Sequence, residues 1–121
     1  MLANVKRGRE QVLDARSAGR FVGTDPEPRE GLRGGHIPGS LNTPYQNLFN
    51  GDGTFLEADA LRSVLTSSGL DMKKPVVTTC GSGVTACVLA LGLHLVGHRQ
   101  VAVYDGSWTE WGGRSDTPVE R

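Results

Sequence analysis

The thiol of Cys80 is the side chain best suited to covalent chemistry in this sequence, within the stretch TTCGSGVTAC at residues 78–87. A short apolar run at residues 75–77 leads into it, and a long apolar run begins at Val84. The residues between are Gly81, Ser82 and Gly83. Glycines lack side chains, so backbone N–H groups can turn inward and form a nest for an anion. The stretch therefore predicts a nucleophile on a loop that stabilises negative charge.

The elements on either side of Cys80 predict where this loop lies. Residues 76–79 are a strand candidate, and residues 84–96 are an apolar helix candidate that Gly97 ends. Ligands of open parallel sheets bind beyond the carboxyl ends of the strands, and a helix N-terminus attracts anions. Both effects favour the thiolate, which is the nucleophilic form of cysteine. The competing interpretation of Cys80 is simple packing, and we expect Cys87, inside the apolar helix, to lie in the core.

Two classes of enzyme use a cysteine on such a loop. Cysteine phosphatases need an arginine at the sixth position after the cysteine to clamp the phosphate. That position is Ala86 here, so phosphatase chemistry is disfavoured. The other class transfers sulfur: the thiolate takes a sulfur atom, holds it as a persulfide and passes it to a second nucleophile.

The remaining elements predict an α/β domain. The Gly- and Pro-rich residues 23–40 are expected to form a long loop, which is more often functional than accidental in a small domain. Apolar spacing predicts an amphipathic helix over 57–67. The other expected elements are strands at 11–15, 41–45 and 101–104 and a helical turn at 17–21 capped by Ser17. A strand, a buried helix and another strand predict a parallel sheet covered on both faces.

Composition limits the class of protein. Thirteen basic residues balance thirteen acidic ones in 121 residues, which argues against nucleic-acid or membrane-surface binding. No apolar run reaches the roughly 18 residues of a transmembrane helix, and the stretch MLANVKRGRE lacks a signal-peptide core. Two cysteines do not make a disulfide framework. We therefore expect a cytoplasmic protein with reduced thiols.

The sequence resembles the rhodanese family of sulfurtransferases, and most specifically the C-terminal catalytic domain of 3-mercaptopyruvate sulfurtransferases. The segments that carry the resemblance are residues 12–31, 35–44, 80–87 and 104–112. It implies a rhodanese-like three-layer α/β fold, a parallel sheet flanked by helices on both faces. It also implies a single rhodanese domain over residues 1–121, without the N-terminal rhodanese domain that the family usually carries.

The resemblance assigns the donor to a loop and two arginines. Gly81 and Ser82 stand where thiosulfate-preferring relatives carry basic residues, which implies 3-mercaptopyruvate. Arg20 and Arg29 match the arginines that hold its carboxylate and ketone, where a fork of donors suits a carboxylate. Without the resemblance, Arg20 would be interpreted as a solvated surface residue, and Arg29 would stay undecided.

The implied mechanism begins with attack of Cys80 on the donor sulfur and leaves a persulfide with release of pyruvate. Ser82 would polarise the donor or relay a proton. The negative sulfur would be supported by Thr85 and by the backbone N–H groups of Gly81, Gly83 and Val84. The implied partners are a small sulfur donor, an acceptor such as thioredoxin, a small thiol or cyanide, and a second rhodanese domain. No cofactor is implied.

Three alternatives remain open at this stage. The donor could be thiosulfate, or the chain could carry sulfur from a desulfurase without processing a donor, which would need Cys80 but neither arginine. The third alternative, an inert interaction domain, fits poorly with an intact cysteine loop. The histidines His36, His94 and His98 match no zinc spacing and are expected to be non-ligands, His94 as a satisfied core residue. We expect Asp14 to bond to backbone or to Arg16, and residues 104–111 to form a packed aromatic corner.

Overall fold

The computed structural model describes residue 4 and residues 10–28, 30–81, 84–104 and 106–121. In this part of the chain, the strands form one parallel sheet of order β2-β1-β3-β4. The strands are β1 (Gln11–Asp14), β2 (Leu41–Asn42), β3 (Val76–Thr79) and β4 (Val101–Val103). The helices are α2 (Ala18–Val22), the 3-10 helix η1 (Tyr45–Leu48), α3 (Ala58–Ser67), α4 (Ala86–Leu95) and α5 (Ser107–Trp111). The expected α/β class with a parallel sheet is confirmed.

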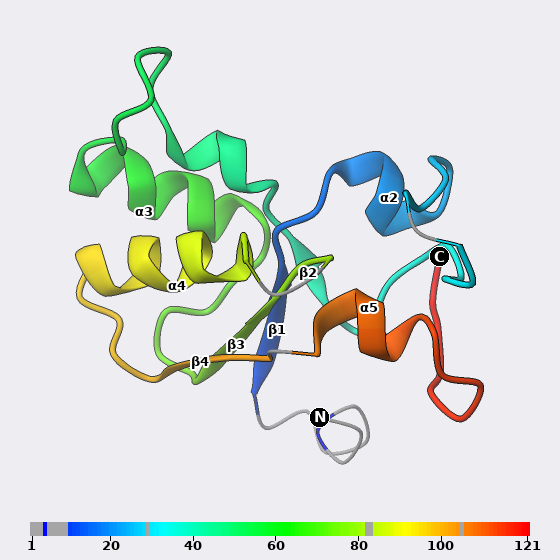
Figure 1. Cartoon of the computed structure of the whole chain (residues 1–121). Helices are drawn as coiled ribbons and strands as arrows, with labels where there is room; N and C mark the ends of the chain where they lie inside the picture. The colour runs from blue at the N-terminus through cyan, green and yellow to red at the C-terminus, as the bar shows by residue number, and fades with distance from the viewer. Residues whose placement is uncertain (1–3, 5–9, 29, 82–83, 105) are drawn as a thin grey trace.

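Helices lie on both sides of the sheet. Helices α3 and α4 lie on one side, and α2 and α5 lie on the other (Figure 1). Side chains alternate along a strand, so neighbouring residues of β1 point to opposite faces. Leu13 packs in a cluster with residues of α3 and α4, whereas Val12 packs with Trp108 and Trp111 of α5. The three-layer arrangement thus follows from one apolar strand with two buried faces.

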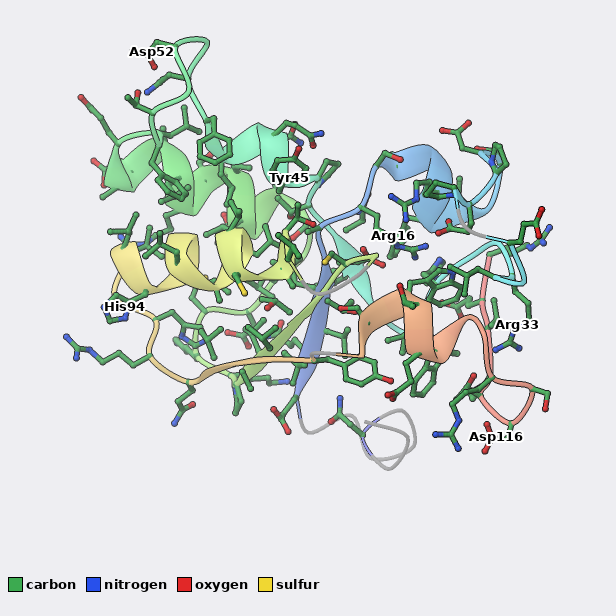
Figure 2. The ribbon with its side chains drawn as sticks, in the orientation of Figure 1. Arg16, Arg33, Tyr45, Asp52, His94 and Asp116 are labelled. Carbon is green, nitrogen blue, oxygen red and sulfur yellow. The ribbon has the colours of Figure 1, made fainter. Side chains whose placement is uncertain are left out.

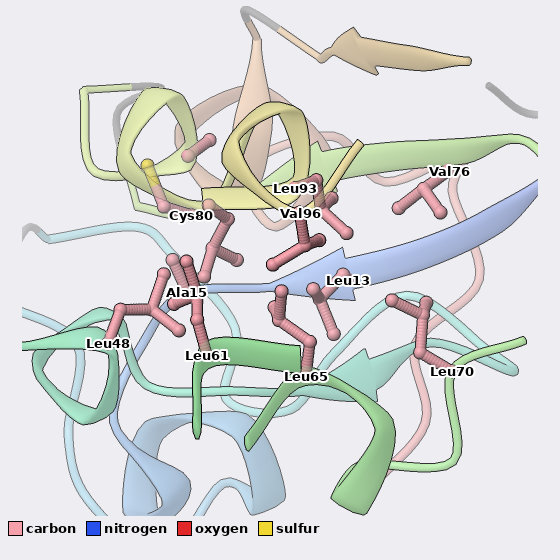
Figure 3. Close-up of a cluster of buried hydrophobic side chains, with 12 residues drawn as sticks. Leu13, Ala15, Leu48, Leu61, Leu65, Leu70, Val76, Cys80, Leu93 and Val96 are labelled. Atoms are coloured by element: carbon pink, nitrogen blue, oxygen red, sulfur yellow. The ribbon is translucent and has the colours of Figure 1, made fainter. Parts of the chain in front are cut away.

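The face of the sheet toward α3 and α4 holds an aliphatic cluster (Figure 3). Its buried members are Leu13, Ala15, Leu48, Leu61, Leu65, Leu70, Val76, Cys80, Ala86, Leu89, Leu93 and Val96. The helix predicted over 57–67 from its apolar spacing is α3, and it buries Leu61 and Leu65 in this cluster. Cys80 lies at one end of the cluster, at the carboxyl end of β3 (Figure 3).

Helix α4 departs from the expected pattern, because part of its surface is exposed rather than buried all round. Ala86, Leu89 and Leu93 are buried, whereas Leu91 and Leu95 are half exposed, at 48% and 50%. Cys87 is exposed, so the prediction of a core cysteine is wrong. His94 is exposed at the far end of the helix rather than in the core, another wrong prediction (Figure 2). Apolar composition alone does not fix which side of a helix is covered.

Candidate functional site

Cys80 follows β3 and is 1% exposed, at the carboxyl edge of the sheet where the sequence placed it. The N-terminus of α4 lies next to this edge, so the peptide dipoles of a ten-residue helix point their positive end toward the loop (Figure 1). Ser82 and Gly83 lie outside the described residues, so the roles predicted for them stay predictions. Val84 is exposed and Thr85 is half-buried without a side-chain capping bond, and their roles stay predictions as well.

The segment before α5 fixes the backbone of Cys80. The N–H of Cys80 donates to Oγ of Ser107 at 3.1 Å, and that hydroxyl donates to the carbonyl of Tyr104 at 2.8 Å. Ser107 is fully buried and has φ 47°, the one positive φ among the described non-glycine residues. Strain of this kind persists where the surroundings over-determine the conformation, often at functional sites.

Helix α5 also holds the carbonyl groups of the loop. The N–H of Trp108 donates to the carbonyl of Cys80, and the N–H of Thr109 donates to that of Gly81, both at 2.8 Å. The hydroxyl of Thr109 donates to the same Gly81 carbonyl at 2.6 Å. These bonds hold both carbonyl oxygens toward α5. The expected packed corner is confirmed, because Trp108 and Trp111 are buried, but the segment also positions the cysteine loop.

Tyr104 adds a neutral hydroxyl beside this segment. Its phenol donates a hydrogen bond to Glu110. Burial, followed by this hydrogen bond, raises the pKa of Tyr104 well above its usual range. The phenol serves the structure as a hydrogen-bond donor.

A chain of four alternating charges leads from the sheet to the loop; we call it the ion chain. Its members, in order of contact, are Asp14, Arg16, Glu27 and Arg20. The expected bond between Asp14 and Arg16 is confirmed, because both Nε and Nη2 of Arg16 donate to the carboxylate. The guanidinium of Arg16 also lies 4.5 Å over the ring of Trp108.

Arg20 ends the ion chain beside the cysteine loop. Its side chain is 27% exposed and pairs with Glu27, Nη2 to Oε1, at 2.9 Å. A Cβ added to Gly81 would lie 2.9 Å from Nη2 of Arg20, so the missing side chain of Gly81 leaves room for the guanidinium. The structure thus brings Arg20, Gly81 and Cys80 together. Arg29 lies outside the described residues.

Sequence reasoning missed two site residues, Glu27 and Ser107. Glu27 comes from the long loop and has a side chain 2% exposed. The signals available were a carboxylate between two prolines in PEP, where the backbone is stiff, and a serine after glycine at the end of a strand. Neither signal names a partner: Glu27 bonds to Arg20 and Arg16, which are 7 and 11 residues away, and Ser107 bonds to Cys80, which is 27 residues away.

No metal site accompanies these groups within the described ranges, where no three His, Cys, Asp or Glu side chains gather to hold an ion. His36 instead stacks on Phe21 at 3.8 Å and contacts Glu120 and the Phe21 carbonyl.

A surface hollow of about 460 Å³ is lined by residues from 23 to 34 and by Arg121. No helix within the described ranges is long and apolar enough to cross a membrane.

Comparison with known proteins agrees with this geometry. The family model described as "Rhodanese-like domain" matches residues 1–114. The chain is 49% identical over 110 residues to "Thiosulfate/3-mercaptopyruvate sulfurtransferase 1, mitochondrial" of Arabidopsis thaliana, covering 91% of this chain and 29% of that protein. It is 49% identical over 111 residues to 3-mercaptopyruvate sulfurtransferase of Mus musculus, covering 92% of this chain and 37% of that protein.

A solved structure is also similar to this chain. The crystal structure of Tum1 protein from Saccharomyces cerevisiae superposes with a TM-score of 0.87 and 38% identity, covering 98% of this chain and 44% of that one. The chain thus spans about a third of the length of the curated relatives named above.

Proposed function

The chain belongs to the family of rhodanese-like domains, and from that premise we propose that it transfers sulfur from 3-mercaptopyruvate through a persulfide on Cys80 to an acceptor thiol. The observation that carries the proposal is the placement of the Arg20 guanidinium against Gly81, next to the buried Cys80. In 3-mercaptopyruvate, two carbon atoms separate the sulfur from the carboxylate carbon. A cation beside the residue that follows the nucleophile is therefore well placed for that carboxylate.

In the first step, the Cys80 thiolate attacks the sulfur of the donor. The new S–S bond forms as the C–S bond breaks, and the electron pair of that bond moves to the carbon of pyruvate enolate. This carbon takes up a proton, and the thiol proton of the donor balances it. Ser82 is proposed to relay this proton, and Arg20 with Arg29 to hold the carboxylate and the ketone.

In the second step, an acceptor thiolate attacks the outer sulfur of the persulfide. The acceptor leaves as a persulfide, and Cys80 returns as a thiolate. Gly81, Gly83, Val84 and Thr85 are proposed to stabilise the negative sulfur between the two steps. We propose thioredoxin or a small thiol as acceptor, with a second rhodanese domain as a further partner.

The experiment is anaerobic incubation with 3-mercaptopyruvate or thiosulfate, followed by intact-mass analysis and pyruvate detection. We expect a gain of one sulfur atom with release of pyruvate from 3-mercaptopyruvate, and no gain in Cys80→Ser. Cys87→Ser is the matched control, because it removes the exposed cysteine and should react like the wild type. A gain of sulfur from thiosulfate alone would favour thiosulfate as the donor, which the name of the Arabidopsis relative also includes. No gain of sulfur from either donor would contradict the proposal.

We also propose a cytoplasmic location, which the cysteine usage supports. The Arabidopsis relative is named as mitochondrial, so location needs its own measurement. Fractionation of cells that express the protein, followed by immunodetection, distinguishes the two compartments.

A further inference from the structure

Glu27 is a buried carboxylate near the cysteine loop that the mechanism does not use. Its side chain is 2% exposed and lies between two guanidinium groups. Oε2 accepts from Nη1 of Arg16 at 3.2 Å and from Nε of Arg20 at 3.3 Å, and Oε1 accepts from Nη2 of Arg20 at 2.9 Å. Burial of a carboxylate is costly, so this arrangement calls for a physical reason.

The charge of Arg16 does not explain why Glu27 is buried here. Asp14 already pairs with Arg16 through Nε and Nη2, and Nη2 also donates to the carbonyl of Gly35 at 2.7 Å. One buried negative charge thus balances one buried positive charge without Glu27. The second charge that Glu27 balances is that of Arg20, which is 27% exposed and has access to water. Buried ion pairs seldom add stability over apolar packing, and their better-attested use is to fix one geometry.

The geometry that Glu27 fixes is that of Arg20. A guanidinium offers two edges to a carboxylate, one through Nε and Nη2 and the other through both terminal nitrogens. Glu27 occupies the first edge. Nη1 of Arg20 has no hydrogen-bond partner among the residues that the structure describes. The second edge is left for another carboxylate, and its Nη2 lies against Gly81.

We propose that Glu27 is a positioning residue for the sulfur donor: it holds Arg20 by one edge of the guanidinium and presents the other edge to the donor carboxylate beside Cys80. This inference rests on the proposed function, because it needs a donor that carries a carboxylate. Glu27 acts through Arg20 and touches no reacting atom.

Steady-state kinetics of Glu27→Gln with 3-mercaptopyruvate tests the proposal, with Asp25→Asn as the matched control. Asp25 is an exposed carboxylate on the same loop, so its variant makes the same change of charge. We expect KM to rise about tenfold in Glu27→Gln, the loss expected for one charge-assisted hydrogen bond, with kcat changed much less. Asp25→Asn should keep the KM of the wild type. Alkylation of Cys80 by uncharged iodoacetamide should be equally fast in all three proteins.

A double-mutant cycle separates positioning from general damage. If Glu27 acts through Arg20, adding Glu27→Gln to Arg20→Ala should change KM by less than about twofold. Glu27→Asp is the second variant; it keeps the charge but shortens the side chain by one methylene group, which should loosen the two bonds to Arg20 and also raise KM. A wild-type KM in folded Glu27→Gln or Glu27→Asp overturns the proposal, as does a full additional loss in the Arg20→Ala background. A wild type that releases no pyruvate contradicts the proposed function instead.

Discussion

The two faces of the sheet are built from different chemistry. The face toward α3 and α4 carries the aliphatic cluster of twelve buried residues. The face toward α5 carries an apolar cluster of four buried residues, Val12, Ile37, Trp108 and Trp111. The ion chain reaches this second face, where Arg16 lies over Trp108. Cys80 belongs to the aliphatic cluster through its side chain and is held from α5 through its backbone.

This difference separates two tasks. Apolar packing is non-directional and stabilises the fold in proportion to the area it buries. Hydrogen bonds and ion pairs are directional, so they set the angle at which Cys80 and Arg20 meet a substrate. We call the side of the sheet toward α5, with the ion chain, the polar face. We therefore expect damage to the aliphatic face to lower stability alone, and damage to the polar face to lower both stability and function.

The largest effect is expected for Arg16→Ala, which leaves Asp14 and Glu27 without their shared cation in a buried position. Removing one partner of a buried ion pair costs about 3–5 kcal/mol. Denaturant titration measures the loss, and a rise in KM in the folded fraction would show that the site is affected too. Arg114→Ala is the control, because its pair with Asp116 is exposed and should contribute nothing measurable. Equal losses in the two variants would remove the distinction between the faces.

The matching test of the aliphatic face is Leu93→Ala. Leu93 is fully buried, and truncation of a buried leucine costs about 2–5 kcal/mol of the free energy of unfolding. Leu95→Ala is the control on the same helix, where half of the side chain is exposed and the loss should be much smaller. Activity per folded molecule should stay at the wild-type value in both. A changed KM in Leu93→Ala would show that the two faces are coupled.

The sequence predicted where the elements of the aliphatic face begin and end because those signals are local, but it did not predict which side of α4 is covered. The strand over 76–79 was predicted with the bounds of β3, and the helix predicted over 57–67 is α3 at Ala58–Ser67. Helix α5 was not predicted as a helix, because SWTEW is short and begins with a serine of positive φ. Its first N–H groups bond to carbonyls of the cysteine loop, and that support comes from a segment distant in the chain.

Some residues of the site could be predicted from the sequence and others could not. Cys80 stood out because glycines and a helix start surround it, whereas Arg20 was selected through family resemblance alone. Its proximity to Gly81 depends on Glu27, and pairing between side chains on a loop leaves no periodic pattern. Sequence patterns indicate which groups are reactive, but the partners that orient those groups are fixed by tertiary contacts.

A smaller effect is expected for Ser107→Ala on the polar face. Its hydroxyl accepts the N–H of Cys80, and a buried donor left without a partner costs about 1–3 kcal/mol. We expect lower stability together with slower persulfide formation, because the backbone of the nucleophile loses its anchor. Denaturant titration and single-turnover mass analysis measure the two effects. The control is Ser63→Ala, an exposed serine on α3, and unchanged persulfide formation in Ser107→Ala would mean that α5 holds the loop without this hydroxyl.

The smallest effect is expected at Glu120, which accepts hydrogen bonds from the N–H of Gly39 and from His36. These contacts lower the pKa of Glu120, the Gly39 bond more than His36. A carboxyl with a lowered folded-state pKa adds stability above its unfolded pKa and loses it as pH falls through the folded one.

Glu120→Gln should therefore lower the melting temperature slightly at neutral pH, and the difference should vanish in acid, where the wild-type carboxyl is protonated. Glu57→Gln is the control, because this exposed carboxylate makes no capping bond to α3. Thermal melts across the acid range measure both. Glu120 contacts His36, which stacks on Phe21 of α2, so a difference that persisted in acid would assign its effect to packing rather than to charge. The polar face would then depend on shape at this contact, as the aliphatic face does throughout.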